Sequence, residues 1–356
     1  MNSSIEIKEN VRLAPLTTLQ VGGNARYFVT AETDDAVIGA LAFAEDKGLP
    51  VFILGGGSNV LISDEGFDGL VLYIAIKGPE FRVSSSESEN SERGTLNSKL
   101  ITAGAGVNWD VFVSHCVEND LAGVECLSGI PGFVGGTPVQ NVGAYGQEVA
   151  ESIVSVRCYD RQQKELVTLS NADCCFSYRK SIFNSTHRER YVVLSVTFAL
   201  IKGGAPKVVY KDLIEHFGER QPSLAEVREA LLSIRRSKSM VIDADDPNSR
   251  SAGSFFKNPI VSQEKLAELH AEIGNVPNFP FGDAVKIPAA WLIEKSGLHK
   301  GFALGNAGIS TNHTLAIVNR GGATANDILL LKNEIQRAVA DKFHITLDPE
   351  PVFVGF

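Results

Sequence analysis

The sequence lacks a basic excess, because its 33 Lys and Arg are outnumbered by 42 Asp and Glu, giving a formal net charge of −9. General nucleic-acid binding and attachment to an anionic membrane both need a basic field and are therefore disfavoured. No apolar run approaches the roughly 20 residues of a membrane-spanning helix. The opening residues, MNSSIEIKEN, have neither the basic nor the apolar region of a secretory signal. We expect a cytoplasmic protein without nucleic-acid or membrane partners.

Cysteine is also scarce. The chain has neither a C-x-x-C motif nor Cys and His at metal-ligand spacing, so we expect no disulfide framework and no metal site. We expect reduced and mostly buried thiols at all five positions: Cys116, Cys126, Cys158, Cys174 and Cys175. By contrast, apolar residues make up 44% of the 356 residues, enough for a sizeable core divided among two or three domains.

Three consecutive glycines interrupt an apolar region in residues 54–60, LGGGSNV. Glycine weakens a strand, so this run predicts a turn in which successive N–H groups could converge on an anion such as a pyrophosphate. No Gly-Lys-Ser/Thr follows, which excludes a P-loop, and Val60 stands where a dinucleotide fingerprint has its third glycine. Taken alone, the run is also typical of an ordinary tight turn.

A second glycine-rich stretch covers residues 128–147, SGIPGFVGGTPVQNVGAYGQ. It has too many glycines for a helix or a central strand, yet it carries five apolar side chains: Ile130, Phe133, Val134, Val139 and Val142. These features predict a buried, ordered loop. The backbone polar groups of such a loop need partners, and a polar ligand lying along it could supply them.

Together the two stretches resemble the UDP-N-acetylenolpyruvoylglucosamine reductases, the MurB family of the vanillyl-alcohol-oxidase-like FAD-binding group. The resemblance continues in SYRKSIF (177–183), GSFFKNP (253–259) and LDPEPVFVG (347–355) and covers nearly the whole chain. It implies an α+β fold: a two-lobed FAD-binding module of the vanillyl-alcohol-oxidase/PCMH-like type with a smaller α+β substrate-binding domain.

The same resemblance implies a division of the chain. Residues 1–78 would form the first FAD-binding lobe, to which residues 325–356 return. Residues 99–240 would form the second lobe, and residues 245–324 the substrate-binding domain. The two glycine-rich stretches would then lie between the domains.

In this family, the reaction is NADPH-dependent reduction of UDP-N-acetylglucosamine enolpyruvate to UDP-N-acetylmuramate through FAD, a step of peptidoglycan precursor synthesis. We expect the FAD to be noncovalent, because the second stretch contains no His or Cys, although His115 and Cys116 lie nearby. We also expect a monomer. The cofactor-binding positions implied by the resemblance are Gly55, Gly56, Gly57, Ser58, Asn59, Val60, Gly129, Ile130, Pro131, Gly132, Gly135, Gly136, Asn141, Gly143, Ala144 and Tyr145.

Three catalytic roles carry over from the motifs. Ser254 matches the general acid that protonates carbon after hydride addition, although most loop serines are simple caps. Arg179 matches the guanidinium that stabilises the developing enolate, and Glu350 would act beside it. Family tails read Glu-Val-Arg here, whereas this chain reads Glu350-Pro351-Val352, so the downstream arginine does not carry over.

The substrate-binding positions match the subclass in which a tyrosine-bearing (type I-like) loop closes over the uridine diphosphate, with a longer loop before GSFFKNP. They are Tyr145, Arg179, Tyr210, Lys238, Asn258 and His313. Lys238 would supply a charge for a phosphate, and Arg235 or Arg236 another. The alternative for the basic residues is stabilisation of a helix C-terminus.

Periodicity and capping signals predict strands and helices in alternation. The predicted strands are 25–30, 70–76, 100–103, 153–160, 165–169, 191–201 and 315–318. The predicted helices begin after Thr33 and Asn108, cover 223–237, 263–273 and 289–296, and end with one that follows a Thr324/Asp327 capping box. The polar segment 79–98 is expected to be a solvated loop.

Two other functions stay open. An FAD oxidase or dehydrogenase acting on an alcohol or hydroxy acid would lack GSFFKNP and the tail glutamate. A non-catalytic nucleotide-binding protein with a flavin shell would be yellow without being bleached by NADPH.

Overall fold

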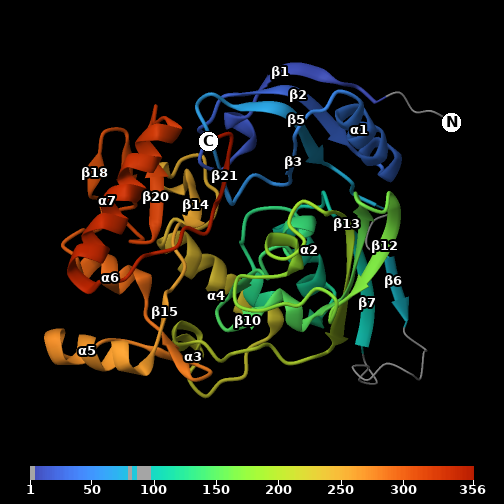
Figure 1. Ribbon diagram of the computed structural model, residues 1–356. Helices are drawn as coiled ribbons and strands as arrows, with labels where there is room; N and C mark the ends of the chain where they lie inside the picture. The colour runs from blue at the N-terminus through green and yellow to red at the C-terminus, as the bar shows by residue number, and fades with distance from the viewer. Residues whose placement is uncertain (1–4, 79–81, 86–97) are drawn as a thin grey trace. The chain divides into compact units, whose positions relative to one another are not determined.

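The computed structural model describes residues 5–78, 82–85 and 98–356 and divides into two compact units (Figure 1). Unit 1 contains residues 1–11, 26–56 and 68–236, and unit 2 contains residues 12–25, 57–67 and 237–356. The chain passes from unit 1 to unit 2 between Gly56 and Gly57, inside the first glycine-rich stretch. Each unit is described below by itself.

Unit 1 holds most of a four-stranded sheet with the order β1-β2-β5-β3. Leu70, Val71 and Leu72 of β5 are fully buried, as the predicted central strand requires. The strands are β1 (Lys8–Arg12), β2 (Asn24–Ala31), β5 (Phe67–Ile74) and β3 (Val51–Leu54). Helix α1 (Asp34–Asp46) begins where the side chain of Thr33 accepts a hydrogen bond from the backbone N–H of Ala36, so the predicted cap is confirmed.

The larger sheet of unit 1 has the order β12-β11-β13-β7-β6, with the short strand β8 (Leu121–Ala122) also on β13. Its other members are β12 (Glu165–Ser170), β11 (Ile153–Asp160), β13 (Tyr191–Lys202), β7 (Ser98–Gly104) and β6 (Arg82–Ser85). Helix α2 (Trp109–Glu118) starts at Asn108, whose side chain accepts from the N–H of Val111. Its Trp109 and Phe112 pack with Phe198 of β13, and burial of each such ring contributes about 1.5–3 kcal/mol.

Unit 2 contains a sheet with the order β14-β20-β19-β18 and three helices. The elements are β14 (Ser251–Ser254), β18 (Ala303–Leu304), β19 (Ala307–Ile309), β20 (Ala316–Asn319), α5 (Gln263–Ile273), α6 (Ala289–Lys295) and α7 (Ala325–Phe343). The capping box before α7 is confirmed, since Thr324 accepts from the N–H of Asp327 and Asp327 accepts from that of Thr324. The buried stripe of α7 completes the core with Ile328, Leu331, Ile335 and Val339.

The last strand, β21 (Val352–Val354), pairs in parallel with β4 (Val60–Ile62), in the register Val352↔Val60. Two segments far apart in sequence therefore share one ladder within unit 2. Helix α4 (Leu224–Ser237) of unit 1 confirms the helix predicted over 223–237 and buries Val227, Ala230 and Leu231, whereas Ile234 is half-buried. The α+β class is confirmed.

Two predictions about the elements need correction. The expected loop over 79–98 is wrong for β6, which pairs antiparallel with β7 in the register Val83↔Ile101; the rest of that segment, 79–81 and 86–97, lies outside the described residues. Pairing with β7 satisfies the backbone hydrogen-bonding groups of β6, although the polar composition of this segment favours a loop. The sequence also gave no signal for helix α3 (Lys211–Phe217), seven residues that follow Tyr210.

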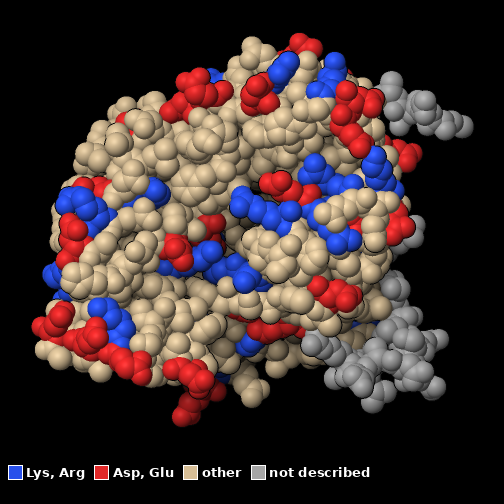
Figure 2. Space-filling view, in the orientation of Figure 1, with Lys and Arg blue, Asp and Glu red and all other residues tan. Residues whose placement is uncertain are grey.

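Among the described residues, no helix is both long and apolar enough to cross a bilayer. On the face shown in Figure 2, Lys and Arg side chains are interspersed with Asp and Glu side chains.

Candidate active site

The first glycine turn joins β3 to β4, and two of its glycines are required by close backbone contacts. A Cβ on Gly56 would lie 2.7 Å from the Cα of Gly132, in the second glycine-rich stretch of the same unit. Gly57 has φ +62° and a Cβ there would lie 1.9 Å from the carbonyl oxygen of Leu16, within unit 2. At Gly55, in contrast, a Cβ would meet nothing within 4 Å.

The turn also presents backbone donors. Within the described part of the chain, the N–H groups of residues 55–58 donate to no protein acceptor, and Gly57 is buried. Buried N–H groups are rarely left without a partner, and consecutive ones form a typical anion-binding concavity. These N–H groups are thus left as backbone donors of the kind that anion-binding turns present.

The second glycine-rich stretch satisfies much of its backbone internally. Gly135 donates to the carbonyl oxygen of Ala105 at 2.9 Å, and Gly136 donates to that of Phe133 at 3.0 Å. Gly129, with φ +71°, donates to Asp110 at 2.6 Å. Only open space lies beside Gly136, where a Cβ would meet nothing within 4 Å. The stretch is thus held largely by the protein itself, and Gly136 is exposed.

Asp110 positions the start of this stretch. Besides Gly129, its carboxylate accepts two hydrogen bonds from Arg228 of α4, at 2.6 and 2.9 Å. Burial acts to raise the pKa of Asp110, but the hydrogen bonds from Arg228 and Gly129 outweigh it and lower the pKa from its usual value. The carboxylate therefore stays charged and ties the second stretch to α4.

A tight hairpin ends the second stretch. Strands β9 (Gly143–Ala144) and β10 (Gln147–Glu148) pair antiparallel around the turn residues Tyr145 and Gly146. Both turn residues have positive φ, +49° and +81°, the pattern of a type I′ turn. Tyrosine rarely adopts a positive φ, so its backbone conformation is maintained by its surroundings.

Arg179 lies on a second tight turn, closed by reciprocal backbone hydrogen bonds between Ser177 and Lys180. It too has a positive φ, +55°. Its Nη2 donates to the carbonyl oxygen of Gly143 at 2.8 Å, so the guanidinium contacts the hairpin that bears Tyr145. Asn141 joins the two segments, since its amide donates to the carbonyl oxygen of Ser177 at 3.1 Å and to Glu148 at 2.7 Å. The structure thus brings Arg179, Gly143 and Tyr145 together.

Tyr145 also contacts Tyr210, the residue before α3. Their rings meet edge to face, with centroids 5.3 Å apart. Arg235 of α4 is 7% exposed and close to Tyr145; burial lowers the pKa of Arg235, and Tyr145 acts in the opposite direction. Arg236 is exposed, and Lys238 falls in unit 2.

In unit 2, Ser254 ends β14 directly after Gly253, which has φ +71°. Its Oγ lies 3.5 Å from Nε2 of His313, another predicted site residue. The N–H of the next residue, Phe255, donates to the carbonyl oxygen of Leu315 at 2.8 Å and fixes the segment on β20. Ser254, at the end of β14, and His313, in the loop between β19 and β20, are therefore neighbours.

The C-terminal tail reaches the same place. The N–H of Glu350 donates to the carbonyl oxygen of Phe255 at 2.8 Å, and Lys257 donates to that of Asp348 at 2.9 Å. Asn59 donates from its side chain to the carbonyl oxygen of Glu350 at 3.3 Å. Unit 2 thus links the segment that follows Ser254 to Glu350 by a main-chain bond, and Asn59 to Glu350 by a side-chain bond.

Asn258 has a structural contact in the described chain: its Oδ1 accepts from the N–H of Ala289, the first residue of α6, at 2.9 Å. This bond fixes the amide and satisfies one N–H group at the start of the helix.

Two acidic residues, Asp110 and Glu125, organise the second glycine stretch but belong to no sequence motif that would have predicted this role. Their only sequence signal is an acidic residue amid apolar neighbours.

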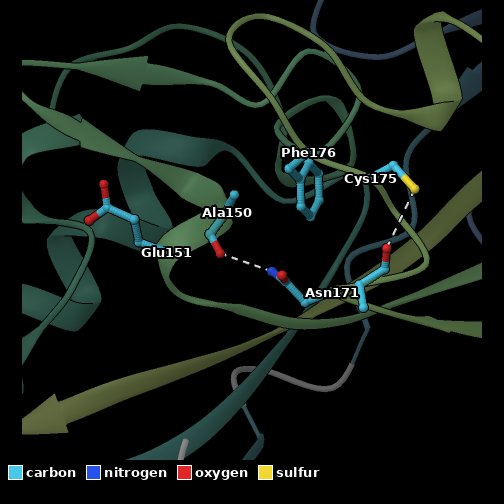
Figure 3. Close-up of a pocket in the computed structure, with 6 residues that line it drawn as sticks. Ala150, Glu151, Asn171, Cys175 and Phe176 are labelled. Carbon is cyan, nitrogen blue, oxygen red and sulfur yellow. Dashed lines mark hydrogen bonds between the residues drawn. The ribbon is translucent and has the colours of Figure 1, made fainter. Parts of the chain in front are cut away.

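A surface pocket of about 450 Å³ lies elsewhere in unit 1 (Figure 3). It is lined by Ala150, Glu151, Asn171, Ala172, Cys175 and Phe176. Its polar lining groups bind the chain itself, because Asn171 donates to the carbonyl oxygen of Ala150 and Cys175 contacts that of Ala172. None of the predicted site residues lines it. No group of metal-ligating side chains occurs in the described ranges.

Comparison with known proteins finds relatives over nearly the whole chain. Residues 25–170 match the model of an FAD binding domain, and residues 245–354 match that of the UDP-N-acetylenolpyruvoylglucosamine reductase C-terminal domain. The chain is 45% identical to the UDP-N-acetylenolpyruvoylglucosamine reductase of Thermobifida fusca, with 97% of both chains covered. It is 46% identical to that of Streptomyces coelicolor, over 96% of this chain and 89% of the other.

A solved structure is similar as well. The crystal structure of UDP-N-acetylenolpyruvylglucosamine reductase (MurB) from Thermus caldophilus aligns over 99% of both chains, with a TM-score of 0.63 and 25% identity. The predicted family and fold are confirmed. With close relatives along its whole length and both characteristic domain models matched, the chain belongs to the UDP-N-acetylenolpyruvoylglucosamine reductase family, MurB.

Proposed function

We propose that this protein reduces UDP-N-acetylglucosamine enolpyruvate to UDP-N-acetylmuramate with NADPH, using noncovalent FAD, in peptidoglycan precursor synthesis in the cytoplasm. The observation that carries the proposal is the junction in unit 2. There the residue after Ser254 is hydrogen bonded to Glu350, and Ser254 Oγ faces His313. A proton donor and a carboxylate on one rigid framework suit protonation of carbon.

The residues proposed to hold FAD are those of the two glycine-rich stretches. The donors of residues 55–58 and the open space beside Gly55 and Gly136 support this assignment. When bound, FAD would supply the hydride, taken from NADPH, for the terminal methylene carbon of the enol ether.

A covalent flavin link is disfavoured at Cys116. The thiol is fully buried in α2, and burial raises its pKa to about 12. The thiolate needed for attachment would therefore be scarce at neutral pH. Acid precipitation should release all of the yellow colour into the supernatant.

Ser254 is the proposed general acid. A hydroxyl is a weak acid, so it needs a donor network behind it, and His313 is the nearest candidate. The contact of 3.5 Å is long for a hydrogen bond, as catalytic contacts often are before substrate binds. Ser254 would give its proton to the carbon next to the reduced methylene, and His313 would restore it.

Arg179 is proposed to stabilise the negative charge that hydride addition places on the enolpyruvyl carboxylate. Its Nη2 bond to Gly143 and its stacking on Tyr178, 5.5 Å from the ring centroid, hold the guanidinium in place. Glu350 would act on the same charge by hydrogen bonding. The proposed substrate contacts are Tyr145, Arg179, Tyr210, Lys238, Asn258 and His313. The division at 1–78, 99–240 and 245–324 and the monomeric state also remain predictions.

One spectroscopic experiment tests the proposal. Anaerobic NADPH should bleach the flavin absorbance of the purified protein, and UDP-N-acetylglucosamine enolpyruvate should restore it. An alcohol or hydroxy acid oxidase would instead be bleached by its own substrate. Colour that neither NADPH nor an alcohol bleaches would point to a binding protein.

A further inference from the structure

Unit 1 contains a buried carboxylate, Glu125, to which the proposed function assigns no role. Glu125, in the short 3₁₀ helix η2 (Glu125–Leu127), is only 1% exposed. Its Oε2 accepts from the N–H of Gly123 at 2.7 Å. Its Oε1 accepts from the N–H of Lys207 at 2.9 Å and from the side-chain amide of Gln147 at 3.3 Å. A buried carboxylate with several donors is costly to replace.

One of these contacts leads to the hairpin of Tyr145. Gln147 is 3% exposed and lies opposite Ala144 in the β9–β10 ladder. Its Oε1 accepts from the N–H of Cys126 at 2.9 Å, so both ends of its amide are bound to η2. The hairpin that carries Tyr145 and accepts Arg179 through Gly143 is therefore fixed by Glu125 and its neighbour.

A second contact leads to Tyr210. Lys207 lies three residues before it, in a segment without helix or strand. Its N–H is bound by Glu125, and its carbonyl oxygen lies 3.2 Å from Sγ of Cys126. One carboxylate thus holds both segments whose tyrosine rings meet at 5.3 Å.

We propose that Glu125 is a positioning residue that sets the spacing of Tyr145 and Tyr210 for binding of the UDP-sugar. The assignment rests on the proposed function. Because the side chain of Glu125 is buried and bound to Gly123, Gln147 and Lys207, it acts on the tyrosines through the segments that carry them and not on the substrate. Binding depends on such pre-organisation, since ordering loose segments takes free energy from the complex.

The test variant is Glu125→Gln. Both carboxylate oxygens of Glu125 accept hydrogen bonds from N–H donors. In Glu125→Gln one of these oxygens becomes an NH₂ group, which would face an N–H donor in either orientation of the amide. The matched control is Glu151→Gln. Glu151 also holds the segment of Lys207, through Nζ at 2.7 and 2.8 Å, but it lies at the surface and lines the pocket of Figure 3. Its Oε1 also accepts from the N–H of Glu148 at 3.0 Å, a bond that the oxygen of a glutamine can keep.

Three measurements are made on the FAD-loaded enzyme. Hydrogen exchange of the peptides covering 143–149 and 205–212 should be faster in Glu125→Gln and unchanged in Glu151→Gln. The KM for UDP-N-acetylglucosamine enolpyruvate should rise at least about tenfold, the effect of losing one buried hydrogen bond to a charged group. The rate of flavin bleaching by NADPH should stay at its wild-type value.

Each other outcome is decisive. If Glu125→Gln shows the same exchange and the same KM as Glu151→Gln, the assignment is overturned. Faster exchange in Glu125→Gln with an unchanged KM would also overturn it, because Glu125 would then be purely structural. If Glu125→Gln does not fold, Gln147→Met, which cuts the link to the hairpin alone, decides by the same criteria. Wild-type enzyme that the UDP-sugar fails to reoxidise would instead refute the proposed function and remove the basis of this assignment.

Discussion

The backbone N–H of Glu350 is bound to the carbonyl oxygen of Phe255 at 2.8 Å, which places the C-terminal tail beside the residue that follows Ser254. The hydrogen bond involves main-chain atoms only, so substitution of either side chain should leave the junction in place. The functions of Ser254 and Glu350 can therefore be tested separately.

Ser254→Ala should separate the two halves of the reaction. Flavin bleaching by NADPH does not need the hydroxyl and should keep its wild-type rate, whereas reoxidation by the UDP-sugar should slow by about 10²-fold or more. Stopped-flow flavin absorbance measures both. Ser262→Ala, which removes the cap of α5, is the control and should affect neither rate. An unaltered reoxidation rate in Ser254→Ala would mean that this serine is a loop residue only.

Gly55 and Gly56 form a matched pair. Alanine at Gly56 would clash with Gly132 backbone at 2.7 Å, so Gly56→Ala should lower the melting temperature even without FAD. Gly55→Ala meets no atom within 4 Å and should leave the FAD-free melting temperature unchanged. If pyrophosphate occupies that space, Gly55→Ala should still weaken FAD binding, measured by flavin fluorescence. Full FAD affinity in Gly55→Ala would place the cofactor elsewhere.

The pair Asp110–Arg228 should make stability depend on acidity. The pKa of Asp110 is lowered in the folded state, so its contribution is complete above the unfolded value near 3.8 and is lost as the pH falls through the folded value. Asp110→Asn should therefore cost about 1–3 kcal/mol at pH 7 and progressively less below about pH 4. Urea unfolding at several pH values gives the difference. A cost that is independent of pH would assign the effect to packing.

Thiol labelling should distinguish Cys175 from the other cysteines. Cys175 is exposed, whereas the other four are buried, and burial raises the pKa of Cys174 to about 12. Native protein should take up one equivalent of an alkylating reagent quickly, and unfolded protein all five. Intact mass measures the number, and Cys175→Ser should abolish the fast uptake. Rapid labelling of a second thiol would show that one of the buried sites opens readily.

Local chemistry made parts of the fold predictable. The Thr324/Asp327 box and the caps at Thr33 and Asn108 depend on residues a few positions apart, and all three are confirmed. Strand β6 depends on its pairing with β7, and the buried Leu213 and Phe217 of helix α3 share a cluster with Cys126 and Val227; composition shows neither contact.

The site divides in the same way. The glycine content of the two stretches is visible in the sequence and predicts tight turns. At Gly56 and Gly57 the structure shows why glycine is needed, because a Cβ there would clash with neighbouring backbone. The bonds of Asn258 to Ala289 and of Glu125 to Lys207 join segments that only the folded chain brings together. Sequence patterns therefore mark the surfaces that face a ligand more readily than the groups that support them.

The pairing of β4 with β21 sets an order of events during synthesis. Val60 and its partner Val352 are about 290 residues apart, which at typical translation speeds is a delay of roughly 15 to 60 s. During that interval β4 leaves the ribosome with its partner strand still unmade, and an unpaired strand is a site for wrong pairing. Unit 2 can complete its fold only after residues 237–356 have been synthesised, long after residues 12–25 and 57–67. A chaperone that binds the nascent chain would therefore be most useful to this protein at residues 57–67.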